Sequence, residues 1–183
     1  QPRHQALILG PPGRGVYTHD DAAGVLKVDE GKDAEVHLYQ PRAAVQYRIY
    51  GHKGNTGHKT FLAPNPGEGA LLTYRLKTKP GDKDDVKIVV KNAAGETVRE
   101  LKGPKNLGLN RATWDLRHEP PVKPEPGGGG GGGGCGPPRG PLVPPGDYAV
   151  TVSVGSHSAS RTVTVQEDPR LQVSAGDRQA WYE

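Results

Sequence analysis

The chain has 183 residues and a formal net charge of +4, and its Lys, Arg, Asp and Glu residues are interleaved, which argues against a nucleic-acid-binding protein. Hydrophobic residues make up only 33%, while 27 Gly and 18 Pro favour turns, so a small core of Val, Leu and Tyr with long loops is expected. The longest apolar runs are too short to span a membrane, and the single Cys135 excludes an intrachain disulfide.

Residues 1–60 are predicted to form an extended arm. Apolar runs at 6–9 and 16–18 flank a Gly/Pro turn, which predicts a short hairpin. Two more extended runs follow at 36–39 and 45–50, before the regular strands that begin near residue 61. We expect the arm to expose apolar side chains and strand edges to a protein partner. The candidate contact residues are Leu7, Ile8, Tyr17, Leu38, Tyr39, Tyr47 and Ile49.

Residues 61–168 alternate apolar and polar side chains with a period of two, which predicts an immunoglobulin-like β-sandwich in an all-β chain. The segment 108–117 is central, because Trp114 can fill the space between two sheets while its indole N–H requires an acceptor. A hairpin turn is expected at 92–95, with Gly95 free to adopt positive φ. The predicted core side chains are Trp114, Tyr74, Leu76, Ile88, Tyr148, Val150 and Val152.

A Gly/Pro-rich loop insertion is predicted at 118–145, and it includes eight consecutive glycines at 127–134. A phosphate-binding glycine loop would need a strand before it, a helix after it and a Lys or Ser/Thr on the phosphate. None of these accompanies the tract, so we expect a flexible loop that is dispensable for folding. In the tail, 169–183, Ser174 and Asp177 have the spacing of a helix N-cap and its third residue.

Metal and acid–base sites are not indicated by the candidate residues. His52 and His58 share a polar loop, but neither Cys nor a carboxylate lies beside them to complete a metal site. The adjacent carboxylates at 20–21 and 84–85 would point to opposite faces of a strand, so neither pair could act as acid and base together.

A nucleophilic triad could be assembled from Ser156, His157 and Asp147. However, Ser156 does not belong to a Gly-x-Ser-x-Gly nucleophile elbow, and all three residues are explained by their positions in turns. The sequence therefore predicts a protein that is not an enzyme and that uses neither a cofactor nor a metal.

Two motifs carry a first resemblance. The segment 108–111 (Gly-Leu-Asn-Arg) precedes Trp-Asp at 114–115, and Pro-Gly-Asp-Tyr at 145–148 opens a later hairpin. This order resembles the immunoglobulin-like domain of flagellar hook-capping proteins, which implies one small sandwich.

A second resemblance covers nearly the whole chain. The segments 7–21, 38–42, 65–76, 114–117 and 168–170 follow the order of motifs in the C-terminal region of bacterial sortilin-like (BNR-repeat) proteins. These exported β-propellers are often labelled glycosyl hydrolase-like or photosystem II stability-factor-like. The resemblance implies a last propeller hairpin followed by a sandwich, outside the cytoplasm.

The departures from that family affect its chemistry. Pro11 and Pro12 replace the usual Thr-His, and a single hairpin cannot close a propeller, so we expect the family's glycosidase chemistry not to be carried over. The function expected instead is a non-catalytic accessory subunit on a larger periplasmic, extracellular or membrane-associated complex, with photosynthetic complexes as one candidate. The alternative is a carbohydrate-binding domain of a secreted hydrolase-like protein, with exposed aromatics among Tyr17, Tyr39, Tyr47 and Tyr50.

Overall fold

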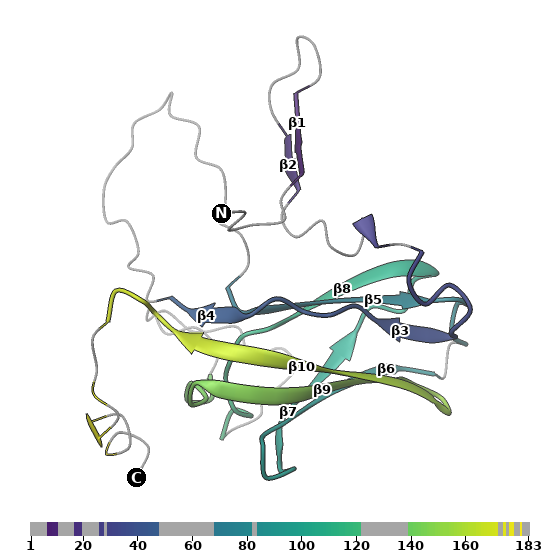
Figure 1. Cartoon of the computed structure of the whole chain (residues 1–183). Coiled ribbons are helices and arrows are strands. Elements are labelled where there is room, and N and C mark those ends of the chain that lie inside the picture. Colours follow the sequence, from purple (N-terminus) through teal and green to yellow (C-terminus); the bar gives the residue numbers. More distant parts are fainter. Residues whose placement is uncertain are drawn as a thin grey trace, which may run out of the picture.

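The computed structural model describes residues 7–10, 17–19, 26–27, 29–47, 68–81, 84–121, 139–171, 174, 176–177 and 180. Strands dominate this part of the chain, and two sheets face one another across a shared apolar core (Figure 1). The all-β class predicted from the alternating sequence is therefore confirmed.

The larger sheet has five strands in the order β4-β10-β9-β6-β7. Its strands are β4 (Ala44–Gln46), β6 (Val86–Lys91), β7 (Thr97–Gly103), β9 (Gly146–Val154) and β10 (His157–Glu167). All neighbours are antiparallel except β4 and β10, which run parallel. The turn between β6 and β7 has Gly95 at φ 84°, as the sequence predicts.

The smaller sheet has three antiparallel strands in the order β3-β5-β8. These are β3 (Val36–Leu38), β5 (Ala70–Leu76) and β8 (Gly108–Trp114). One face of each strand turns toward the larger sheet, so the apolar members of the two sheets form one core. The other face carries mainly polar side chains.

Trp114 lies at the centre of this core and is fully buried. Its indole Nε1–H donates to the backbone carbonyl of Arg117 at 3.1 Å, and its ring meets Tyr148 edge-on with 5.2 Å between centroids. Directly beyond the strand, Leu116 adopts a φ of 57° and is also buried. All seven side chains predicted for the core are buried: Trp114, Tyr74, Leu76, Ile88, Tyr148, Val150 and Val152.

The loop between β7 and β8 is held by two polar side chains. The Asn110 side chain accepts from the Asn106 backbone N–H at 3.0 Å and donates to the Asn106 carbonyl at 2.6 Å. The Tyr74 hydroxyl donates to the carbonyl of Pro104, and burial raises the pKa of Tyr74 to about 12. Asn110, part of the Gly-Leu-Asn-Arg motif, therefore has a structural role in this loop.

The prediction that the arm extends to residue 60 was wrong, because β3 and β4 belong to the two sheets. The chain leaves β3 and crosses to the larger sheet through Pro41, which is buried. At the crossing, the Gln40 side chain donates to the Thr162 carbonyl at 2.9 Å. Each of these strands has only three residues, so a period-of-two pattern is too short to separate them from a loose arm.

A separate hairpin precedes the two sheets. Its strands, β1 (Leu7–Leu9) and β2 (Tyr17–His19), pair antiparallel, which confirms the predicted hairpin. The two strands form their own two-stranded sheet, and the hairpin stands away from the larger body of the fold (Figure 1). It is therefore an appendage to the core.

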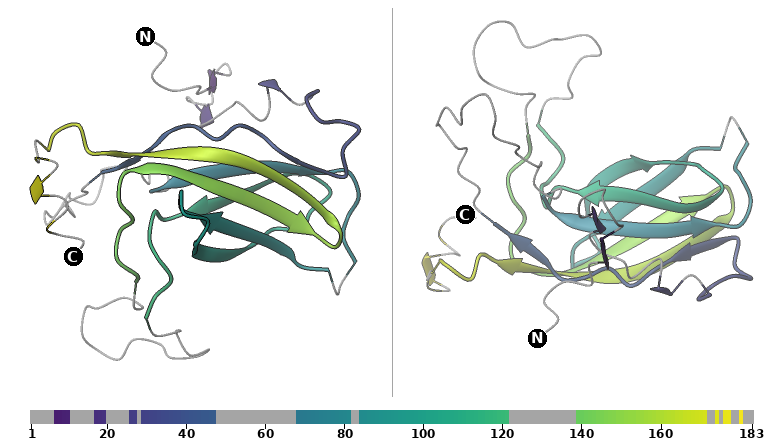
Figure 2. Two further views of the ribbon diagram at one scale, coloured as in Figure 1. Left: turned by 60° about the horizontal axis from the view of Figure 1, so that its bottom comes forward. Right: turned by 90° about the horizontal axis from the view of Figure 1, so that it is seen from above.

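The insertion is narrower than the predicted 118–145. Arg117 bridges to Leu142, and the His118 backbone N–H donates to the Pro141 carbonyl at 2.9 Å, so both ends leave the fold side by side (Figure 2). Val143 is fully buried and therefore belongs to the core. The glycines at 127–134 and Cys135 lie outside the described residues, as do His52, His58 and the carboxylates at 20–21.

Candidate functional sites

A polar cluster lies on the outer face of the smaller sheet, turned away from the core. Strand register places His37 opposite Arg75, and the Tyr39 backbone N–H donates to the Thr73 carbonyl at 3.1 Å, so Tyr39 and Thr73 are also opposite. His37 and Tyr39 are two residues apart on one strand, and their rings meet edge-on at 4.8 Å. We call His37, Tyr39, Thr73 and Arg75 the outer-face cluster.

Three atoms of the outer-face cluster are buried without a hydrogen-bond partner among the described residues. They are His37 Nε2, the Tyr39 hydroxyl and Thr73 Oγ1. Tyr39 is only 2% exposed and Thr73 only 7%. Each unpaired buried polar group lowers the stability of the folded state by about 1–3 kcal/mol, so these three atoms destabilise this face of the sheet.

Two arginines, Arg75 and Arg161, and two carboxylates, Glu30 and Asp29, act electrostatically on the cluster. Burial lowers the pKa of His37, and the nearby Arg161 and Arg75 lower it further while Glu30 raises it. Burial also raises the pKa of Tyr39 above its usual value, so this hydroxyl stays protonated at neutral pH.

A short loop contacts His37 and Arg75 of the cluster. The Arg75 guanidinium donates to the Lys32 carbonyl at 3.0 Å, which ties the strand to the loop above it. Gly31, at φ 69°, lies so close to the His37 imidazole that a Cβ at this position would overlap the ring. The loop therefore packs on His37 through its backbone.

Of the predicted partner residues, the structure describes the side chains of Leu38, Tyr39 and Tyr47. Leu38 is fully buried and Tyr39 is 2% exposed, so the prediction that they contact a partner was wrong. Both sit in β3 or directly after it, where the strand is packed between β5 and the larger sheet. The side chains of Leu7, Ile8, Tyr17 and Ile49 lie outside the described residues.

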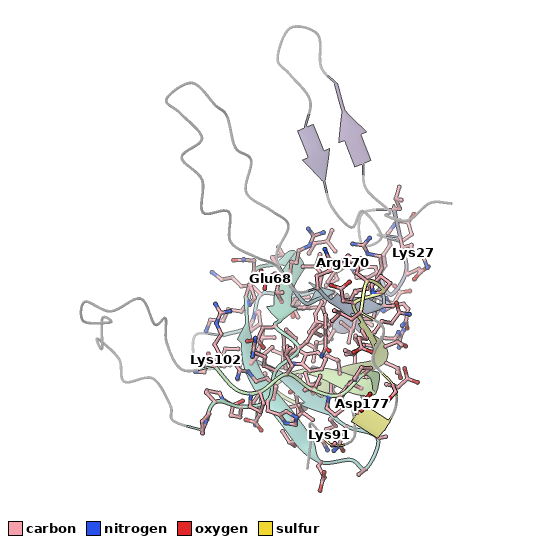
Figure 3. All side chains as sticks on the ribbon, turned by 90° about the vertical axis from the view of Figure 1, so that its left-hand side faces the viewer. Lys27, Glu68, Lys91, Lys102, Arg170 and Asp177 are labelled. Atoms are coloured by element: carbon pink, nitrogen blue, oxygen red, sulfur yellow. The ribbon has the colours of Figure 1, made fainter. Side chains whose placement is uncertain are left out.

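Tyr47 is the one predicted contact residue that the structure shows exposed, at 53%. The Arg170 guanidinium lies 5.8 Å from the centre of its ring, close enough for a cation–π contact. Asp168, 1% exposed, accepts from Arg170 Nε at 2.8 Å and from its backbone N–H at 3.0 Å. The Asp-Pro-Arg motif thus fixes the end of β10, and Figure 3 shows Arg170 on the side of the β1–β2 hairpin.

The three residues of the considered triad lie apart. Ser156 lies in the β9–β10 turn and His157 begins β10, while Asp147 is near the start of β9 and pairs with Thr164 at the far end of the hairpin. Asp147 accepts a hydrogen bond from the Thr164 hydroxyl at 2.7 Å. Ser156 and His157 instead line an open cleft of about 270 Å³ together with Asp84, and among the described residues no hydrogen bond joins these three.

Two exposed leucines lie at the start of β8. Leu107 is 65% exposed and Leu109 40%, and β8 is an edge strand of the smaller sheet. In the sequence, Leu109 belongs to the Gly-Leu-Asn motif and Leu107 lies directly before it.

Comparison of the chain with protein-family models, curated proteins and solved structures found no match. Within the described ranges, no helix is long and apolar enough to cross a membrane. In this part of the chain, no group of three or more His, Cys, Asp or Glu side chains could hold a metal ion.

The sequence did not identify the outer-face cluster as a site. Alternation correctly predicts that Thr73 and Arg75 point outward, but this signal is shared by every solvated strand face. The loop at Gly31 and Lys32 contacts His37 and Arg75 of the cluster, and these tertiary contacts have no local sequence pattern.

Proposed function

We propose that this chain is a non-catalytic, immunoglobulin-like interaction module. Its strand order supports the assignment: β3, β5 and β8 correspond to A, B and E of such a domain, and β6, β9 and β10 to C, F and G. The fourth strand, β7, pairs with β6 instead of β8. Because β7 joins the larger sheet, the smaller sheet has only three strands, and β8 is one of its edge strands.

A tyrosine near the start of strand F supports the same assignment. Immunoglobulin-like domains often place a Tyr here, with its hydroxyl bonded to backbone a few residues upstream. Tyr148 occupies this position and donates to the Pro144 carbonyl at 2.7 Å. The large tryptophan differs in place, since Trp114 lies on the strand equivalent to E and packs on Tyr148.

Replacing Tyr148 by Phe is expected to lower the free energy of unfolding by about 1–3 kcal/mol, because the Pro144 carbonyl loses its donor at a partly buried corner. Chemical denaturation measures this difference. Tyr47→Phe is the matched control: Tyr47 is exposed, so loss of its hydroxyl should leave the free energy of unfolding unchanged. Equal stability of the Tyr148→Phe and parent proteins would show that the hydrogen bond from Tyr148 to Pro144 does not stabilise the fold as it does in immunoglobulin-like domains.

The proposed role is that of an accessory subunit or domain docked on a larger assembly outside the cytoplasm, at the outer side of a bacterial membrane. One observation carries this proposal: the β1–β2 hairpin pairs only within itself and stands away from a core that closes without it (Figure 1). An appended hairpin offers free strand edges to a partner. Tyr47 and Arg170 extend this contact region onto the sheets.

Deleting residues 1–20 is expected to leave the two sheets folded and to abolish co-purification with the partner complex. Tagged full-length and truncated proteins would be recovered from native envelope membranes and their associated proteins compared by mass spectrometry. A short Gly-Ser link in place of 127–134 provides the control deletion, because the insertion leaves the fold at a different place (Figure 2). Retention of the same partners by the folded truncated chain would overturn the docking role of the hairpin.

A further inference from the structure

We propose that the outer-face cluster of the smaller sheet binds a small oxyanion, a carboxylate or an inorganic sulfate or phosphate. The ligand would be held by His37, Tyr39 and Thr73, with Arg75 beside them. This site is independent of the proposed docking hairpin.

The first argument is the supply of donors. Tyr39, directly after β3, lies opposite Thr73 of β5; both residues are more than nine-tenths buried, and neither hydroxyl has a partner among the described residues. The His37 ring packs edge-on against the Tyr39 ring at 4.8 Å, and its Nε2 is likewise without a partner. All three can donate to oxygen, and an oxyanion accepts several donors at once.

The second argument is charge. Arg75 and Arg161 both lie close enough to lower the pKa of His37. Arg75 donates to the Lys32 carbonyl and Arg161 to the Ser160 carbonyl, and neither forms an ion pair within the described ranges. Two guanidinium groups without carboxylate partners beside buried donors favour an anion over a cation or a neutral ligand.

Within the described part of the chain, the nearby carboxylates form ion pairs with lysines of the same loop and not with Arg75 or Arg161. Glu30 pairs with Lys27 at 3.2 Å, and Asp29 pairs with Lys32. Their charges are therefore largely matched by lysines of the same loop. A bound oxyanion would face the arginines and the donors of the sheet.

The test is a titration of the intact chain with sodium sulfate, phosphate, acetate and glucuronate, each compared with sodium chloride at equal ionic strength. Imidazole resonances followed by NMR report on His37, and His157 in an exposed turn serves as the internal control. We expect saturable shifts and a raised pKa for His37 alone, because a bound anion stabilises the imidazolium. The sulfate and phosphate arms separate an inorganic ligand from a carboxylate.

Two variants test the named donors. Tyr39→Phe and Thr73→Val should each weaken binding by about tenfold or more, since each removes a hydrogen bond to a charged ligand. Thr78→Val, at an exposed position, should leave binding unchanged. Arg75→Gln provides a further variant if either donor variant fails to fold. The absence of any anion-specific, saturable response at His37 in the parent protein would overturn the proposal, as would unchanged affinity in the folded variants.

Discussion

Replacing Trp114 by Ala is expected to lower the free energy of unfolding by about 3–5 kcal/mol. The side chain is fully buried, so its removal leaves a cavity between the two sheets. It also removes the edge contact with Tyr148 and the donor to the Arg117 carbonyl, which helps to hold the turn after β8. Small domains have about 5–15 kcal/mol of stability in total, so this one change removes much of it.

Far-ultraviolet circular dichroism with thermal and chemical denaturation measures the Trp114→Ala loss without relying on tryptophan fluorescence. Leu107→Ala is the matched control, because Leu107 is 65% exposed and surface changes usually stay within about 0.5 kcal/mol. A Trp114→Ala protein that melts within a few degrees of its parent would show that Trp114 does not anchor the core.

The longer strands could be predicted because they alternate over six or more residues. In β6, the buried Val86, Ile88 and Val90 are separated by Lys87 and Val89, which are exposed or half-buried. A run of this length distinguishes a strand from a loop, and Gly95 marks the turn that follows it. Local pattern and tertiary burial agree in this part of the chain.

The extended runs at β3 and β4 were predicted, but their place in the two sheets could not be predicted in the same way. Three residues of β4 pair in parallel with Val165, Gln166 and Glu167, more than 100 positions away. Nothing near β4 in the sequence encodes that partner, because parallel pairing requires long connections. The outer-face cluster has the same origin, since strand register places His37 opposite Arg75 and Tyr39 opposite Thr73.

Leu116 shows a further limit of pattern reasoning. In the alternating segment 108–117, Leu116 is two residues after Trp114, which places it on the same face as Trp114, and it is buried. However, β8 ends at Trp114, and Leu116 reaches the core through a left-handed backbone conformation. Its carbonyl accepts from the Val143 N–H at 2.9 Å, so the conformation joins β8 to the end of the insertion. A non-glycine residue in this region costs free energy, which the buried contact must offset.

Deleting residues 1–47 is expected to unfold the protein, in contrast with deletion of residues 1–20. The longer deletion removes β3 and β4, which cover the edges of β5 and β10. It also removes Leu38 and Tyr39, which are 0% and 2% exposed, and burial of one large apolar side chain contributes about 1.5–3 kcal/mol. Together with the lost strand pairing, this loss approaches the whole stability of a small domain.

The two deletions can be compared by circular dichroism melting and by the dispersion of amide resonances in NMR spectra. We expect the chain without residues 1–20 to keep a cooperative transition close to that of the parent, because β1 and β2 pair only with one another. The chain without residues 1–47 should lose the transition at 37 °C, because the uncovered edges of β5 and β10 would have neither strand partners nor the apolar cover of β3. If it instead melts cooperatively at the parent temperature, then β3 and β4 contribute little to the core, and residues 36–47 would again be candidates for a detachable arm.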